Sequence, residues 1–255
     1  FQTGKSILLP WDAILAGKLA DADVIIPHTE FNRQIEISVP AILKQEELKP
    51  GARIELPSVT SHLQFSRYRK VLDGYELVCR ETGFSEYIEE LRMVKDDAEI
   101  ATLLKASELT NTLIDMLKKS VEAGTLRTEV DVALFLDSTA RNHGAEGMGF
   151  ETIAAGPARS YGIHAFPAFT NMNFGTSGMS ILDFGVKVDG YTSDITLTVL
   201  RGEMSGLQEK MISLVEEAYT LAASMVRPGT GSFDIAKSVD DLFSKAGMSM
   251  PHGQI

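Results

Sequence analysis

Two aspartates lie on either side of a predicted hairpin turn, at a spacing that could bring their carboxylates together. Asp183 precedes and Asp194 follows Asp189-Gly190, a pair preferred in tight type I′ turns, and Val and Ile residues flank both ends. With Asp189 and Gly190 as the two loop residues, Asp183 faces Thr196 across the hairpin. Side chains alternate faces along each strand, so Asp183, Asp194 and Thr196 share one face. The two aspartates are then diagonal neighbours, roughly 7 Å apart or slightly less at Cβ.

This pair of carboxylates could hold metal ions. Two carboxylates so close repel each other and are costly to bury without a counter-charge. A pair of divalent metal ions roughly 3.5–4 Å apart would supply that charge and would fit the gap. Two alternatives stay open from the hairpin alone. The aspartates could be solvated residues beside a surface turn, or a one-residue bulge could place them on opposite faces.

Composition narrows the classes of partner. The net charge of −11, with no basic stripe, argues against a nucleic-acid partner. Cys79 is the only cysteine, so an intrachain disulfide is impossible, which fits a reducing compartment. No apolar run reaches membrane-spanning length, and no signal-peptide pattern opens the chain. We therefore expect a cytoplasmic protein with neither a nucleic-acid nor a membrane partner.

The first part of the chain alternates between strand and helix patterns, which predicts an α/β layered domain. Strands are expected at residues 6–10, 23–27, 53–57 and 75–79, and helices at residues 11–20, 39–47 and 67–72. Asp12 is the expected N-cap of the first helix. No Gly-rich phosphate loop joins a strand to a helix, which argues against nucleotide binding.

Helical patterns dominate the second part and flank the hairpin on both sides. After a charged amphipathic segment at residues 86–95, helices are expected at residues 97–121, 128–142, 207–226 and 233–246. Residues 144–156 are rich in Gly and small side chains and predict a strand, followed by a loop that presents His164. Residues 124–130 resemble residues 229–235, each between two helices, which hints at two related halves that meet around the carboxylates.

Four segments resemble, in order and spacing, the pita-bread metallopeptidases, a superfamily that includes aminopeptidase P, prolidase, methionine aminopeptidase and creatinase. These segments are Gly149–Gly156, His164–Pro167, Leu182–Gly185 and Gly190–Thr196. The first part of the chain is similar to the small creatinase-type domain of aminopeptidase P and prolidase, on the residues Leu8–Asp12, Glu90–Lys95 and Glu99-Ile100. Methionine aminopeptidases lack this domain. The resemblance implies an α/β chain with a partial creatinase-like domain at residues 1–92. A pita-bread α+β domain, partial because its C-terminus is missing, follows at residues 93–255.

The resemblance also implies roles for individual residues. The first Asp of the family hairpin binds one metal and the second bridges both, so Asp183 and Asp194 become the expected metal ligands. The expected cofactors are two divalent metal ions, Mn²⁺ (manganese) first and Co²⁺ or Zn²⁺ as alternatives. His164 matches a family His beside the substrate, although from sequence alone it is equally a surface-loop imidazole.

The end of the chain resembles the start of another family segment. Pro251-His252-Gly253 looks like the beginning of a His-Gly-x-x-His segment, in which the first His lies near the substrate and the second binds metal. His252 is therefore the second expected catalytic residue. The ligand His and two Glu ligands would lie beyond Ile255, and Phe1 stands where a start Met is expected, so we expect both ends of the chain to be cut.

The activity implied is removal of the first residue from peptides with proline in second position, by water activated on the two metal ions. Creatinase does not use the metal site, so retention of Asp183 and Asp194 favours a peptidase. The alternatives are a prolidase, and a non-catalytic pita-bread module or inactive fragment that binds protein partners. Family members are usually dimers, so a homodimer is expected. His28 and His62 are expected at the surface.

One position departs from the family. Relatives often carry Arg where this chain has Leu197, and that difference could alter a salt bridge near the site.

Overall fold

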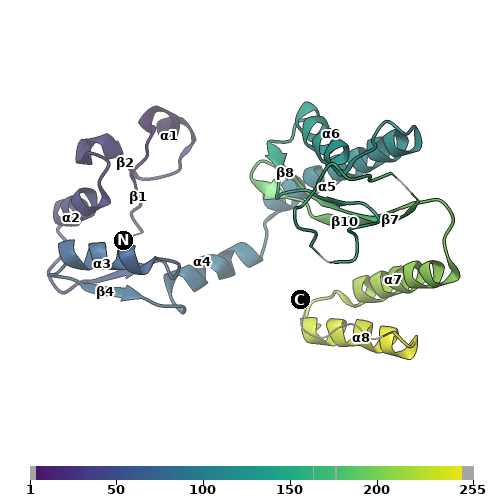
Figure 1. Ribbon diagram of the computed structural model, residues 1–255. Coiled ribbons are helices and arrows are strands. Elements are labelled where there is room, and N and C mark those ends of the chain that lie inside the picture. Colours follow the sequence, from purple (N-terminus) through teal and green to yellow (C-terminus); the bar gives the residue numbers. More distant parts are fainter. Residues whose placement is uncertain (1–3, 163, 176, 249–255) are drawn as a thin grey trace. The chain divides into compact units, whose positions relative to one another are not determined.

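The computed structural model describes residues 4–162, 164–175 and 177–248. The chain divides into two compact units, unit 1 at residues 1–95 and unit 2 at residues 96–255. Unit 1 is coloured purple to blue in Figure 1, and unit 2 teal to yellow.

Unit 1 is an assembly of short parallel strand pairs and helices. β1 (Ile7–Leu8) pairs with β2 (Val24–Ile25), and β3 (Arg53–Leu56) pairs with β4 (Glu76–Cys79), both in parallel. The helices are α1 (Ala13–Leu19), the 3₁₀ turn η1 (His28–Phe31), α2 (Ile35–Gln45), α3 (His62–Val71) and α4 (Phe84–Met93). Asp12 caps α1 as expected, because its carboxylate accepts from Leu15 N at 2.8 Å.

Two helices of unit 1 begin earlier than predicted. α2 starts at Ile35 rather than residue 39, and Pro40 lies inside it instead of at its first turn. α3 starts at His62 rather than residue 67, because Ser61 and Gln64 form a capping box in which each side chain bonds the other residue's backbone N–H. The start of α2 has no such signal, since Gln34 at its N-cap makes no side-chain cap hydrogen bond.

Helices of unit 2 lie close to the predicted boundaries. They are α5 (Asp97–Glu122), α6 (Glu129–Asn142), α7 (Gly206–Met225) and α8 (Ser232–Lys245). Thr128 caps α6, since its Oγ1 atom accepts from Asp131 N at 3.1 Å. α5 and α6 pack on each other and against the strands, and α7 packs along α8 as an antiparallel pair (Figure 1).

The strands of unit 2 form two small antiparallel sheets. β6 (Ile153–Ala155), β7 (Gly178–Phe184) and β10 (Ile195–Arg201) form one sheet in the order β10-β7-β6. β5 (Gly147–Met148), β8 (Val186–Val188) and β9 (Tyr191–Thr192) form the other in the order β5-β8-β9. A single hairpin runs through both sheets, since β7 continues into β8 and β9 continues into β10.

One apolar cluster fixes the position of this hairpin. Leu113 and Leu117 of α5, Leu136 of α6, and Leu182 and Phe184 of β7 are members, and each is at most 2% exposed. Alternate residues of β7 therefore face the helices, which leaves Asp183 on the opposite face of the strand.

Candidate active site

The pairing of the hairpin agrees with the predicted register. Val188 is opposite Tyr191 next to the turn, and Asp183 is opposite Thr196 beyond the bend. The two sets of pairs stay in step, so the described strands carry no extra residue and the bulge alternative is wrong. Asp189 has φ +47° and Gly190 φ +82°, as a type I′ turn requires.

The hairpin bends at Gly185, where one sheet gives way to the other. A Cβ atom on Gly185 would lie 1.8 Å from the carbonyl oxygen of Ser193, so only glycine fits this crossing. Ser193 Oγ accepts from Val186 N at 2.9 Å and lies 2.7 Å from Thr110 Oγ1 of α5. Gly149 N donates to Gly185 O at 2.8 Å. Gly185 contacts Ser193, the residue immediately before Asp194, so this crossing influences where Asp194 lies relative to Asp183.

Asp183 is partly buried and electrostatically strained. Its Oδ1 atom is buried and has no hydrogen-bond partner in the part of the chain that the structure describes. Burial, and then the neighbouring carboxylate of Asp194, raise the pKa of Asp183 above its ordinary value of 3.8, while hydrogen bonding to Thr196 and the charge of His164 oppose the rise. Asp194, Thr196 and His164 therefore lie near enough to Asp183 to influence its pKa.

This chemistry fits a bound cation. An unpartnered buried carboxylate oxygen beside a second carboxylate is an arrangement that a divalent cation would satisfy. Among the described residues, the carboxylate oxygens of Asp183 and Asp194 are the candidate metal ligands. Within residues 4–162, 164–175 and 177–248, no three His, Cys, Asp or Glu side chains gather as a metal-binding group.

His164 lies on an exposed loop between β6 and β7. It lines a small pocket of about 120 Å³ together with Arg159, Tyr161 and Phe166. Tyr161 and Phe166 are 92% and 97% exposed. His252, the other predicted catalytic residue, lies outside the described residues.

Glu129 is a residue of this region that sequence reasoning missed. It lies in the first turn of α6, where acidic side chains are common and usually face solvent. Its side chain is instead fully buried and hydrogen-bonds to both ends of the loop that carries His164. No local sequence signal distinguishes such a buried glutamate from an ordinary helix-start residue.

One further expectation about a single residue is wrong. His28 was expected at the surface, but it is 6% exposed, packs edge-on against Trp11 at 6.2 Å, and its Nε2 atom is buried without a hydrogen-bond partner among the described residues. Leu197 is paired with Leu182 and packs on the core, on the opposite face from Asp183, and its effect on a salt bridge stays a prediction. His62 is exposed, as expected.

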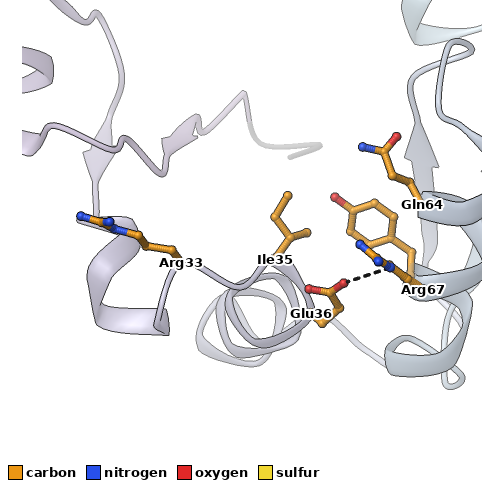
Figure 2. Close-up of a pocket in the computed structure, with 6 residues that line it drawn as sticks. Arg33, Ile35, Glu36, Gln64 and Arg67 are labelled. Atoms are coloured by element: carbon orange, nitrogen blue, oxygen red, sulfur yellow. Dashed lines mark ion pairs between the residues drawn. The ribbon is translucent and has the colours of Figure 1, made fainter.

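A separate pocket of about 210 Å³ lies in unit 1 and contains none of the predicted site residues. It is lined by Arg33, Ile35, Glu36, Gln64, Arg67 and Tyr68. Figure 2 shows Glu36 facing Arg67, with which it forms an ion pair at 3.8 Å, and Arg33 pointing away from them. The Arg33 guanidinium lies over the Trp11 ring at 4.8 Å. Arg67 and Arg33 therefore each have a partner within the chain.

Residues 101–254, more than half of the chain, match metallopeptidase family M24. The chain belongs to this family. Among similar proteins are uncharacterised peptidases of Staphylococcus aureus. The one from strain USA300 is 26% identical over 198 residues, and the one from strain MRSA252 is 27% identical over 202 residues. Each match covers 76% of the chain and 54% of the relative, so the chain spans about half the length of these relatives.

Solved structures show the same fold. The Xaa-Pro dipeptidase from Bacillus anthracis superposes with a TM-score of 0.79 at 22% identity, over 94% of this chain and 64% of that one. The X-Pro aminopeptidase from Thermotoga maritima superposes with a TM-score of 0.76 at 22% identity, over 94% of this chain and 65% of that one. The prolidase from Pyrococcus furiosus superposes with a TM-score of 0.77 at 18% identity, over 94% of this chain and 66% of that one. The predicted α/β pita-bread fold is thus confirmed. None of the M24 chain's described helices has both the length and the apolarity needed to cross a bilayer.

Proposed function

We propose that this M24 protein is a metal-dependent aminopeptidase that removes the first residue from peptides with proline in second position. The observation that carries the proposal is the carboxylate of Asp183, which has a buried oxygen without a hydrogen-bond partner among the described residues and feels the charges of Asp194 and His164. Membership of a metallopeptidase family supports hydrolysis of peptides. The names of the structural neighbours, X-Pro aminopeptidase, Xaa-Pro dipeptidase and prolidase, support proline in second position.

Asp183 and Asp194 would hold the metal ions, two in number and Mn²⁺ before Co²⁺ or Zn²⁺, because hard carboxylate oxygens suit Mn²⁺. Bound divalent ions would supply a water molecule acidified to near-neutral pKa and polarisation of the scissile carbonyl. Thr196 would keep the Asp183 carboxyl oriented through its hydrogen bond. The exposed ring of His164 would offer an N–H to the substrate beside the carboxylates. His252 stays a predicted second substrate-facing residue.

A prolidase, which takes only dipeptides, is the nearest alternative. A non-catalytic module that binds protein partners is the alternative from another class. The buried, unpartnered Oδ1 atom of Asp183 counts against it, because such a group burdens a fold that has no cation to bind. A homodimer and a cytoplasmic location stay predictions.

The test uses the protein at its natural length, stripped of metal and then supplied with Mn²⁺. Release of Arg from Arg-Pro-Pro should require added Mn²⁺, and Arg-Ala-Ala should be cleaved far more slowly. Asp183→Asn should abolish both cleavage and the heat of Mn²⁺ binding in calorimetry. Absence of metal-dependent release from Arg-Pro-Pro sinks the proposal. Cleavage of Arg-Pro but not of Arg-Pro-Pro would replace it with the prolidase alternative.

A further inference from the structure

The loop that carries His164 is anchored at both ends and open in the middle. It leaves β6 at Gly156 and returns to the protein at Thr170. Between these ends Tyr161 and Phe166 are almost fully exposed, and His164 is exposed as well. Ala165, next to His164, packs against the small cluster of Ile153, Ala155 and Ala168, and the hydrogen bonds at the two ends of the loop add to that contact in fixing the position of His164.

One carboxylate serves both ends. Glu129 Oε1 accepts from Gly156 N at 2.8 Å and from Arg159 Nε at 3.1 Å. Glu129 Oε2 accepts from Thr170 N at 2.8 Å and from Thr170 Oγ1 at 2.7 Å. Each oxygen is thus committed to one end of the loop, and the side chain of Glu129 is 0% exposed.

Arg159 extends the clamp toward His164. Its guanidinium forms the ion pair with Glu129, and the Arg159 side chain is only 14% exposed. A second nitrogen of the guanidinium donates to the carbonyl oxygen of Pro167, on the far side of His164 in the sequence. The segment from Arg159 to Pro167 is therefore closed on itself through a buried ion pair that rests on helix α6.

We propose that Glu129 is a positioning residue that holds His164 against the Asp183 and Asp194 carboxylates by clamping both ends of this loop. The inference deepens the proposed function and rests on it for the role of His164 toward substrate. Ion pairs buried this fully have exacting geometry, because any shift exposes an unpaired charge to a low-dielectric surrounding.

The substitution Glu129→Gln tests the clamp with little change in shape. An amide supplies one acceptor oxygen in place of two, so its NH₂ group must face a donor at one of the two loop ends. Asp131→Asn is the matched control. Asp131 lies about half a turn further along α6, where its carboxylate accepts from Thr128 N and Arg127 N, and it forms no hydrogen bond with the described residues of the loop.

The first measurement is amide hydrogen exchange, with each variant held at the same interval below its own melting temperature. Glu129→Gln should speed exchange in peptides that carry His164 by about ten-fold or more. Asp131→Asn should leave those peptides at the wild-type rate. Equal protection in wild type and Glu129→Gln overturns the clamp, as does equal loss in both variants.

The second measurement is a double-mutant cycle with His164→Ala on Arg-Pro-Pro hydrolysis by the protein at natural length. Glu129→Gln alone should lower kcat by about ten- to a hundred-fold with a smaller change in KM. In the His164→Ala background the same substitution should lower kcat less than about two-fold, because its effect passes through His164. Independent effects in the cycle overturn the positioning role. If wild type cleaves no Xaa-Pro peptide, the proposed function fails, and the exchange comparison alone supports or overturns the clamp.

Discussion

Asp183 and Glu129 are two carboxylates of unit 2 with opposite environments. The Glu129 carboxylate accepts four hydrogen bonds from the described residues of the loop it holds, and the Arg159 guanidinium compensates its charge. Asp183 has a buried oxygen without a partner and a like charge in Asp194. A compensated carboxylate stabilises the native state, whereas an uncompensated one destabilises it unless a cation binds.

This contrast predicts opposite signs for two conservative substitutions in the metal-free chain. Asp183→Asn removes the repulsion and should raise the melting temperature at neutral pH by about 2–4 °C, the shift that roughly 1 kcal/mol produces in a domain of this size. Glu129→Gln should lower it, because a donor at one end of the loop loses its acceptor. Differential scanning calorimetry on chelator-treated protein measures both, and a fall in the melting temperature of Asp183→Asn would show that the carboxylate is compensated within the fold.

At the scale of elements, the bent hairpin positions the two aspartates, and two of its glycines are required for different structural reasons. Gly190 adopts φ +82° at the turn, and a Cβ atom there would meet nothing within 4 Å. Gly185 lies at the crossing, where a Cβ atom would meet the backbone carbonyl of Ser193 at 1.8 Å. Turn conformation is a local demand, whereas the crossing involves two strands and both aspartates.

Alanine substitutions at these two glycines should therefore differ in size. Gly190→Ala should cost about 1 kcal/mol of unfolding free energy, the ordinary cost of a left-handed conformation for a residue with a Cβ atom. Gly185→Ala should cost about 3 kcal/mol or more, because the backbone of Ser193 must move. Urea titration followed by far-UV circular dichroism compares the two, and equal costs would mean that the bend can relax without loss.

Local features of the site were predicted from the sequence, whereas features that depend on contacts between distant segments were not. The register of Asp183 with Thr196 followed from the turn preference of Asp189-Gly190 and the alternation of side chains, both local properties. The change of sheet at Gly185 was not predicted, because it depends on how Ser193 and Gly149 contact that residue across the sheet. The burial of Glu129 was missed for the same reason, since its hydrogen-bond donors lie 27 to 41 residues further along the chain.

At the scale of the whole molecule, apolar burial is unevenly divided between the two units. The main core cluster, with the hydrophobics packed against it, falls between Ala106 and Val199, all in unit 2. Unit 1 buries few large apolar side chains, of which Ile42, Leu43, Leu56 and Leu72 are less than a tenth exposed. Its described strands form two-stranded pairs, and such pairs are marginally stable without further packing. The unit that holds the candidate site therefore has the larger share of hydrophobic stabilisation.

We expect unit 1 to unfold before unit 2, and the chain has a convenient reporter. Trp11 is the only tryptophan, and it contacts Arg33 and His28 within unit 1. Its fluorescence therefore follows unit 1, whereas far-UV circular dichroism is dominated by the long helices of unit 2. In urea the fluorescence midpoint should precede the dichroism midpoint by roughly 1 M or more, as a gap of a few kcal/mol gives with slopes of about 1–3 kcal/mol/M. Trp11→Phe should remove the early fluorescence change and keep the later transition. Coincident midpoints from the two probes would instead mean that both units unfold as one cooperative body, with the stability of the candidate site tied to unit 1.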